Sequence, residues 1–272
     1  MTKSLSKGIF YALLVLFSLF FLIPFYVMVV TSLKPFDEVS IATMWQLPSA
    51  INLSSYAQAF AKLVPNFLNS LYIVIPATLI SALLGSLNGY VLSKWKFKGS
   101  EWVFTALLFG MFIPYQSVLI PLIKTIQVLG LYNTIPGLVL TNVVYGIPLT
   151  TLMFRNFYAS IPDSMIESAQ IDGAGFIRIF RFIIIPLSIT GFVVVSIWQF
   201  TNIWNEFLFA ITITGSEQQP IMVALQNLAG SQIVEWNVQM AGAILAALPT
   251  MIVYIFAGRY FIQGLLAGSV KG

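Results

Sequence analysis

The stretch from Ile161 to Gly175 reads IPDSMIESAQIDGAG and lies between two strongly apolar segments. Its proline suits the first turn of a helix, and Gly173 suits the helix end, because glycine tolerates a left-handed backbone. A short apolar face is formed by residues at helical spacing, namely Met165, Ile166 and Ala169. The stretch therefore predicts a short amphipathic surface helix. It can dock in a groove of a partner or lie in the lipid interface, and physics alone favours neither.

The composition of the whole chain excludes a soluble protein. Of its 272 residues, 58% are apolar and only 8% are charged, whereas soluble domains carry about 25% charged residues. The chain has no His and no Cys, so it lacks the usual zinc, haem and iron–sulfur ligands, and also thiol nucleophiles and imidazole bases.

Six apolar stretches are long enough to span a membrane, which needs roughly 20 residues. They predict an all-α integral membrane protein that forms one domain over residues 1–272, with spans at about 9–31, 67–93, 102–123, 134–154, 183–203 and 240–262. The fourth is the weakest, since its Pro, Gly and Asn residues suit a broken or cavity-lining helix. The first is too long for a signal-peptide core, and no cleavage site follows it.

The positive charges set the expected orientation. With six spans and a cytoplasmic N-terminus, ten of the 13 Lys and Arg residues fall on the inner side. Both termini are then cytoplasmic, and so is the loop 155–182 between spans four and five. The basic, aromatic segment 94–98 at the inner end of span two predicts a lipid-surface anchor rather than a nucleic-acid site.

The central loop resembles the EAA loop of ABC importer permeases. The family pattern of Glu-Ala-Ala, Gly, nine residues and Ile-x-Leu-Pro is matched by Glu167-Ser168-Ala169, Gly173 and Ile183-x-Ile185-Pro186. Two departures are mild, Ser168 for Ala and Ile185 for Leu. The run Asp172-Gly173-Ala174 also fits the carbohydrate branch, and the C-terminal segment is similar to the smaller permease of maltose transporters, MalG. Further blocks that resemble the family run from Asn69 to Gly272.

The resemblance implies a permease subunit with several partners in a prokaryotic inner membrane. It implies a second homologous permease, two cytoplasmic ATPase subunits that bind ATP and Mg²⁺, and an extracytoplasmic sugar-binding protein. This chain would hold no cofactor and would not be an enzyme, and it lacks a phosphate-binding loop. The coupling to the ATPase would rest on Glu167, Ser168, Ala169, Asp172, Gly173, Ile183 and Pro186.

A polar face on the fifth span is a candidate substrate path. Asn202 and Glu206 lie four residues apart and share a helix face with Trp198, and Asn205 follows closely. Amides, carboxylates and aromatic rings are the groups that recognise sugars. The alternative is ordinary hydrogen bonding between helices, with Trp204 in the aromatic belt at the membrane surface.

A long outer segment precedes the last span and resembles the family's periplasmic loop that meets the binding protein. Its candidate contact residues are Gln226, Asn227 and Gly230, and a merely solvated loop is the alternative. The sequence does not identify the sugar: a faint resemblance favours glucose or mannose, and an oligosaccharide such as an α-glucoside is left open.

Two other classes of protein remain as alternatives. An autonomous ion-coupled carrier commonly holds a carboxylate deep in a span, but Glu101 and Glu206 lie near the expected span ends. An intramembrane enzyme would need a nucleophile and a base, for which a serine–lysine pair is still available.

Overall fold

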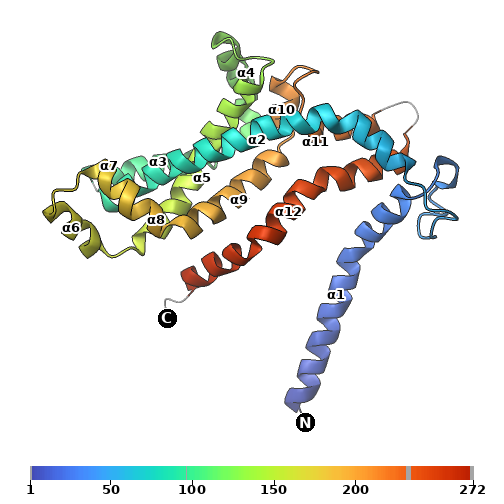
Figure 1. The fold of residues 1–272 in the computed structure, drawn as a ribbon, viewed down its shortest axis with the longest axis horizontal. Helices are drawn as coiled ribbons and strands as arrows, with labels where there is room; N and C mark the ends of the chain where they lie inside the picture. The colour runs from blue at the N-terminus through green and yellow to red at the C-terminus, as the bar shows by residue number, and fades with distance from the viewer. Residues whose placement is uncertain (1, 96, 231–233, 270–272) are drawn as a thin grey trace. The chain divides into compact units, whose positions relative to one another are not determined.

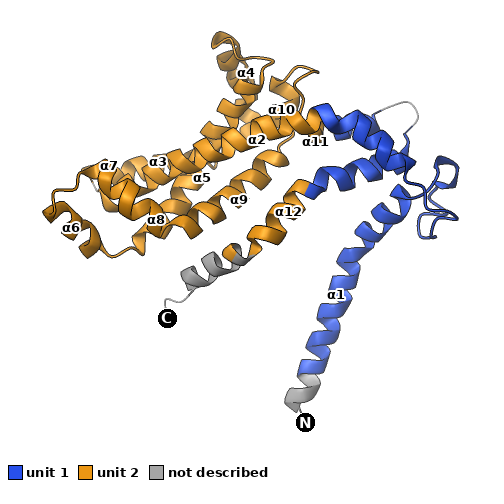
Figure 2. Cartoon of the chain, in the orientation of Figure 1, with its two compact units in different colours: residues 1–65, 224–248 blue, residues 66–223, 249–272 orange. Residues whose placement is uncertain are grey.

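The computed structural model describes residues 2–95, 97–230 and 234–269, and the secondary structure within these ranges is entirely helical. The chain forms two compact units (Figure 2). The first contains Met1–Pro65 and Ala224–Leu248, and the second contains Asn66–Val223 and Pro249–Gly272. The expectation of a single membrane domain over the whole chain stays a prediction.

Four of the described helices are long and apolar enough to cross a membrane by themselves. They are α1 (Thr2–Ser32), α2 (Ser54–Lys94), α5 (Ile135–Ala159) and α12 (Trp236–Ser269). Two bent helix pairs raise the number of spans to six if each pair is one span. Six spans are thus compatible with the described residues, while the sidedness of the termini stays a prediction.

The bent pairs correspond to the expected third and fifth spans, which are not straight helices as the sequence suggested. α3 (Ser100–Gly110) is followed by the 3₁₀ turn η2 (Tyr115–Val118) and α4 (Leu119–Val128), with a bend of 91°. The second pair joins the run Phe176–Leu187 to α9 (Ile189–Trp204) with a bend of 78°. Apolar composition predicts that a segment is buried in lipid, but it says nothing about its direction.

The expected fourth span shows the opposite deviation, because α5 is one continuous helix. Thr134 caps it by accepting a hydrogen bond from the Gly137 nitrogen at 3.2 Å. Pro136 falls in the first turn, where a missing N–H removes no helical bond. Pro136 and Gly137 therefore start this helix rather than break it, whereas Pro148 lies inside it. The alternative of a cavity-lining helix fits better, since Asn142 and Gly146 line a cavity. Its end at Ala159 also lies beyond the expected boundary at 154.

Local backbone chemistry explains the connection from α4 to α5. Gly130 has φ of +70° and Asn133 has φ of +60°, conformations that glycine and asparagine tolerate best. The Leu131 nitrogen donates to the Ile126 oxygen at 2.9 Å and the Gly130 nitrogen to the Gln127 oxygen at 3.0 Å. These two bonds form a Schellman motif, which ends α4 and directs the chain into α5.

In the second unit, α2 approaches α5 closely, and α5 also packs against α3 and α9, so that α2, α3, α5 and α9 run alongside one another there (Figure 1). Gly85 and Gly89 lie one helical turn apart on α2 and touch α5. A Cβ on residue 89 would lie 2.7 Å from the Phe154 Cβ and 2.8 Å from the Arg155 nitrogen. The pair is a small-xxx-small motif, which lets two helix backbones approach within a membrane. Its partner helix cannot be read from the sequence of α2 alone.

The first unit has a small core of its own, made by Ala59, Val238 and Ala241. Asn237 reinforces it, because its side-chain nitrogen donates to the Lys34 oxygen at 3.2 Å and to the Ser55 hydroxyl at 3.0 Å. α1 contributes little to this core, since only 6% of its most apolar window is buried. A lone apolar helix of this kind needs lipid or another protein around it.

Candidate functional site

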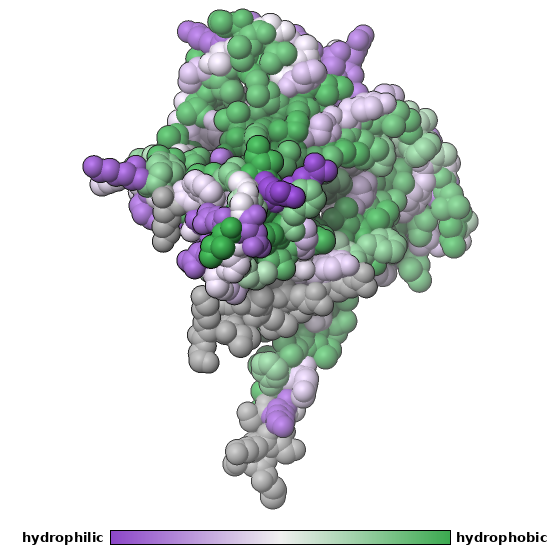
Figure 3. All heavy atoms as spheres, turned by 60° about the vertical axis from the view of Figure 1, so that its left-hand side comes forward, coloured by the Kyte–Doolittle hydropathy of each residue, from purple (hydrophilic) through white to green (hydrophobic). Residues whose placement is uncertain are grey.

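The central loop contains the predicted amphipathic helix, α6 (Asp163–Ile171). Ile166 is 5% exposed and belongs to a buried cluster with Tyr90, Tyr158 and Ile179, while Ala169 packs against its edge. Glu167, Ser168 and Asp172 are exposed. Figure 3 turns the side that carries α6 toward the viewer, and hydrophilic side chains gather on this side. α6 is therefore held by Ile166 and Ala169. Met165, which the sequence placed on the same apolar face, is 42% exposed.

Gly173 ends α6 as the sequence predicts. Its φ is +79°, in the left-handed region. The Ala174 nitrogen donates to the Ala169 oxygen at 2.9 Å and the Gly173 nitrogen to the Gln170 oxygen at 3.0 Å. This Schellman motif satisfies the carbonyl groups of the last turn and sets the direction in which the chain leaves α6.

The start of α6 is tied to the end of α2 by Lys94. Its side chain is only 5% exposed, and its Nζ lies 2.6 Å from Asp163 Oδ1 and 2.5 Å from the Ile161 oxygen. The sequence alone predicts that Lys94 belongs to a lipid-surface anchor. That interpretation is wrong for Lys94, because the fold brings a carbonyl and a carboxylate within reach of its ammonium group.

We expect Lys94→Met to loosen α6 without unfolding the second unit. Hydrogen bonds to charged groups contribute about 1.5–3 kcal/mol. The stabilisation lost here should lie at the low end of this range, because Asp163 is exposed and water screens its attraction to Lys94. Amide hydrogen exchange in residues 163–171 should accelerate about tenfold. Lys94→Arg should change it less, and unchanged exchange in Lys94→Met would show that Lys94 does not hold α6.

Beyond Gly173 the chain runs through consecutive helical elements into α9. They are α7 (Phe176–Ile179), the π-helical turn η3 (Phe180–Ile184) and α8 (Ile185–Leu187). Ile183 packs against the cluster that holds Ile166, and Pro186 is exposed in the first turn of α8. α6 is thus connected to α9 by a short and almost uninterrupted helical path.

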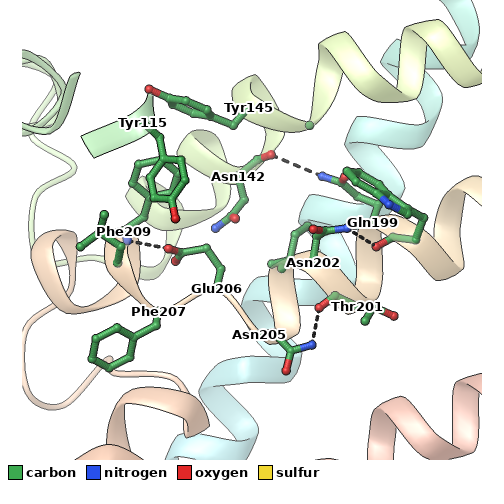
Figure 4. Close-up of a pocket in the computed structure, with 14 residues that line it drawn as sticks. Tyr115, Asn142, Tyr145, Gln199, Thr201, Asn202, Asn205, Glu206, Phe207 and Phe209 are labelled. Carbon is green, nitrogen blue, oxygen red and sulfur yellow. Dashed lines mark hydrogen bonds between the residues drawn. The ribbon is translucent and has the colours of Figure 1, made fainter. Parts of the chain in front are cut away.

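α9 borders a cavity of about 570 Å³ in the second unit (Figure 4). All four residues of the predicted substrate path line it, namely Trp198, Asn202, Asn205 and Glu206. Polar residues from α5 and α9 join them, and aromatic rings complete the wall, among them Tyr115, Tyr145, Phe207 and Phe209. The cavity combines amides, a carboxylate, hydroxyl groups and aromatic rings, as a site for a polyhydroxylated ligand requires.

Hydrogen bonds within the wall hold several of these groups in place. The Asn202 and Asn205 side-chain nitrogens donate to the Trp198 and Thr201 oxygens, at 2.9 and 2.8 Å. Gln199, which is 2% exposed, donates to the Ser81 hydroxyl at 3.2 Å and to the Asn142 oxygen at 3.4 Å. Gln199 therefore joins α9 to α2 and α5 at the cavity wall.

Glu206 has a structural partner in addition to its place in the wall. Its carboxylate accepts hydrogen bonds from the Phe209 nitrogen at 2.6 Å and the Ala210 nitrogen at 2.9 Å. These nitrogens lie in the first turn of α10 (Leu208–Ile213), where a negative charge stabilises a helix. Glu206 thus caps α10.

A family model described as the binding-protein-dependent transport system inner membrane component matches residues 77–266. The chain belongs to this family. A probable ABC transporter permease of Pyrococcus horikoshii is 43% identical over 269 residues, 98% of each chain. The xylose/arabinose import permease XacI of Haloferax volcanii is 36% identical over 279 residues, which cover 94% of this permease and 90% of that one.

Solved structures share the fold of this permease. A bacterial ABC transporter involved in the import of alginate matches with a TM-score of 0.84 at 21% identity, covering 96% of this permease and 98% of that chain. A bacterial alginate ABC transporter in complex with an alginate pentasaccharide-bound periplasmic protein matches with a TM-score of 0.70 at 16% identity, covering 92% and 93%. The expected resemblance to carbohydrate-uptake permeases is confirmed, and the permease is a multi-pass inner-membrane protein.

The predicted contact residues for a binding protein lie at the end of α11 (Ile221–Ala229). Gln226, Asn227 and Gly230 are exposed there. The segment is helical rather than an extended loop, and the Leu225 oxygen accepts a bond from the Gln239 side chain at 3.0 Å. Their role in binding a partner stays a prediction.

Sequence reasoning missed the aromatic residues contributed by other elements to the cavity, Tyr115 and Tyr145 above all. Tyr115 follows Pro114 at the bend between α3 and α4, and the proline was a signal that this span is interrupted. Trp204 was assigned to an aromatic belt as one alternative. It is instead 2% exposed and packs on Phe67 and Phe200, with ring centroids 5.6 and 5.7 Å away.

Proposed function

We propose that this permease forms half of the translocation pathway of an ATP-driven sugar importer. A second homologous permease forms the other half, two cytoplasmic ATPase subunits bind and hydrolyse ATP with Mg²⁺, and an extracytoplasmic protein delivers the sugar. Family membership supports this assembly, as do the import functions named for its relatives and the periplasmic partner in a fold neighbour.

The observation that carries the proposal is the short helical path, with one 78° bend, from α6 to the cavity. α6 presents Glu167, Ser168 and Asp172 on an exposed face while Ile166 is buried. The chain then passes from Gly173 through α7 and α8 into α9, which lines the cavity. A force on α6 from an ATPase groove would be transmitted to the cavity wall, because helices and packed cores transmit displacement rather than absorb it.

In this proposal the sidedness follows the positive charges, with α6 and both termini in the cytoplasm. Gln226, Asn227 and Gly230 then lie on the outer side, where a binding protein can reach them. An autonomous carrier is less well supported, since Glu101 pairs with Arg155 at 2.6 Å and Glu206 caps α10. Each carboxylate thus has a structural partner.

The deciding experiment is purification and reconstitution of the complex. The permease should co-purify with a second permease and two ATPase subunits in fixed proportion. In proteoliposomes the complex should take up sugar only with ATP and the binding protein. Uptake by the permease alone, driven by an ion gradient, would refute the importer. A panel with glucose, mannose, pentoses and oligosaccharides identifies the sugar, with glucose or mannose expected.

We expect Trp198→Ala to reduce sugar uptake by about three- to tenfold, the equivalent of one aromatic contact of about 0.5–1.5 kcal/mol. ATP hydrolysis stimulated by the binding protein should persist, because Trp198 lies far along the path from α6. Trp102→Ala is the matched control, since Trp102 is 80% exposed on α3 and does not line the cavity. Equal sugar uptake by the two variants would show that Trp198 is not part of the substrate path.

A further inference from the structure

The segment between α1 and α2 is a closed loop that lies within the first unit (Figure 2). Its ends are joined, because the Asn52 nitrogen donates to the Leu33 oxygen at 2.9 Å. Lys34 is only 2% exposed, and its Nζ donates to the Thr43 oxygen at 2.6 Å. The Thr43 hydroxyl in turn donates to the Glu38 oxygen at 2.6 Å. The loop is therefore held by its own hydrogen bonds, and its outward side chains have fixed positions.

These outward side chains are mainly apolar. Residues 39–53 contain no charged side chain. Ile41 is 89% exposed, and the other large apolar side chains that the loop exposes are Phe36, Trp45, Leu47, Ile51 and Leu53. So many exposed apolar groups in one short, uncharged stretch mark a contact with a protein or a membrane rather than with water.

Tyr26 fixes the level of this loop along α1. Its hydroxyl donates to the Trp45 oxygen at 2.9 Å. Tyr26 lies six residues before Ser32, the last residue of α1, which is about 9 Å along a helix axis. The apolar run of α1 continues past Tyr26 to Val30. The loop therefore folds back beside α1 to a level that α1 occupies with apolar residues.

The lipid interface is the partner that fits this geometry. α1 is a candidate membrane span with only 6% of its most apolar window buried, and the loop continues the apolar surface of α1 at its end. Trp and Tyr side chains favour the level of the lipid headgroups, because each combines an apolar ring with a polar group. The lack of charge in residues 39–53 leaves no charge pairing with which to orient a polar protein surface.

We propose that residues 39–53 form an interfacial membrane anchor at the face of the bilayer reached by the C-terminal end of α1. Their apolar side chains enter the boundary between headgroups and hydrocarbon, and Tyr26 sets the depth of the loop. The anchor fixes the height of α1 in the bilayer. Since residues 39–53 are uncharged, the contact does not depend on anionic lipid. The inference requires that α1 spans the membrane and is independent of the proposed importer function.

The test is the accessibility of a spin label on the loop in the reconstituted complex, in vesicles of phosphatidylcholine and phosphatidylglycerol. The permease has no cysteine, so a label is placed at Ile41→Cys or Leu47→Cys, and the complex without either substitution gives the background signal. Oxygen is concentrated in the bilayer and a nickel chelate in water, so the ratio of their relaxation effects reports the depth of the label.

We expect the oxygen-to-nickel ratio at both sites to be about threefold or more above that of the matched control, Asp37→Cys. Asp37 is exposed in the same loop, and its carboxylate needs water. The ratios should be the same in vesicles of phosphatidylcholine alone, because the contact is apolar.

Tyr26→Phe tests what sets the depth. Phenylalanine keeps the ring and removes only the hydroxyl group that holds Trp45. We expect the ratio at Leu47→Cys to fall about twofold or more, because the released carbonyl groups of the loop favour water over lipid. Tyr11→Phe is the matched control, since Tyr11 is 65% exposed on the same helix, and it should leave the ratio unchanged.

The outcomes are distinct. If the nickel chelate reaches Ile41→Cys and Leu47→Cys as readily as Asp37→Cys, the loop stands in water and the anchor is overturned. Low accessibility to both reagents would mean that another subunit or the binding protein covers the loop, which overturns the anchor as well. An unchanged ratio in Tyr26→Phe would overturn the role of Tyr26 in setting the depth. The label reports the position of the loop whether or not the complex transports sugar, so a failure of the importer proposal appears separately, in the uptake assay.

Discussion

Sugar uptake should fall about tenfold or more when Gly173 is replaced by valine. At φ of +79° an L-residue loses roughly 1–2 kcal/mol, and a β-branched one is disfavoured further. The Schellman motif at the end of α6 would open, and α6 would lose its fixed direction relative to α7. Uptake and stimulated ATP hydrolysis, measured together in proteoliposomes, should both decrease, because the proposed coupling serves both.

Two variants make this result specific. Gly175→Val places the same side chain two residues away, where the backbone is extended at φ −79° and ψ 173° and no atom lies within 4 Å of the added Cβ. It should behave nearly as the unaltered permease. Gly173→Asn should be intermediate, since asparagine tolerates the left-handed region. If Gly173→Val retains full uptake and full ATPase stimulation, α6 does not couple the two processes.

The permease should fail to fold when Gly89 is replaced by leucine. The new side chain would meet the Phe154 Cβ at 2.7 Å and the backbone nitrogen of Arg155 at 2.8 Å. A backbone atom cannot rotate away, so α2 and α5 would have to separate where Gly85 and Gly89 now let them approach. We expect a loss of more than about 3 kcal/mol, at the upper end of the range for overpacking.

The measurement is the yield of monodisperse permease in detergent and its thermal unfolding temperature. Gly110→Leu is the control, because Gly110 ends α3 and no atom lies within 4 Å of an added Cβ. Its yield should match that of the unaltered protein. A Gly89→Leu variant that unfolds at the original temperature would mean that α2 and α5 do not cross closely at this position.

Much of the site could be predicted from sequence because its chemistry is local. The end of α6 at Gly173 depends on one residue's backbone preference, which is visible in the sequence. The shared face of Trp198 and Asn202 depends only on helical periodicity, and the structure places both on the cavity wall. Glu206 also lines the cavity, but it does not share that helix face as predicted, because α9 ends at Trp204 and Glu206 lies in the connection to α10. The aromatic rings opposite them come from α5 and from the bend after α3, so helical periodicity within one span could not predict them.

Composition alone determined that this chain is a helical membrane protein, because lipid forces apolar runs into helices whatever surrounds them; the described residues hold four to six candidate spans. The tertiary structure decided where those helices bend, cross and connect. Lys94 and Tyr158 show the reason, since each is held by groups 67 to 72 residues away along the chain. The role of an ammonium group or a hydroxyl group depends on the hydrogen-bonding partner that the fold brings to it. The residues next to it in the sequence do not reveal which partner that is.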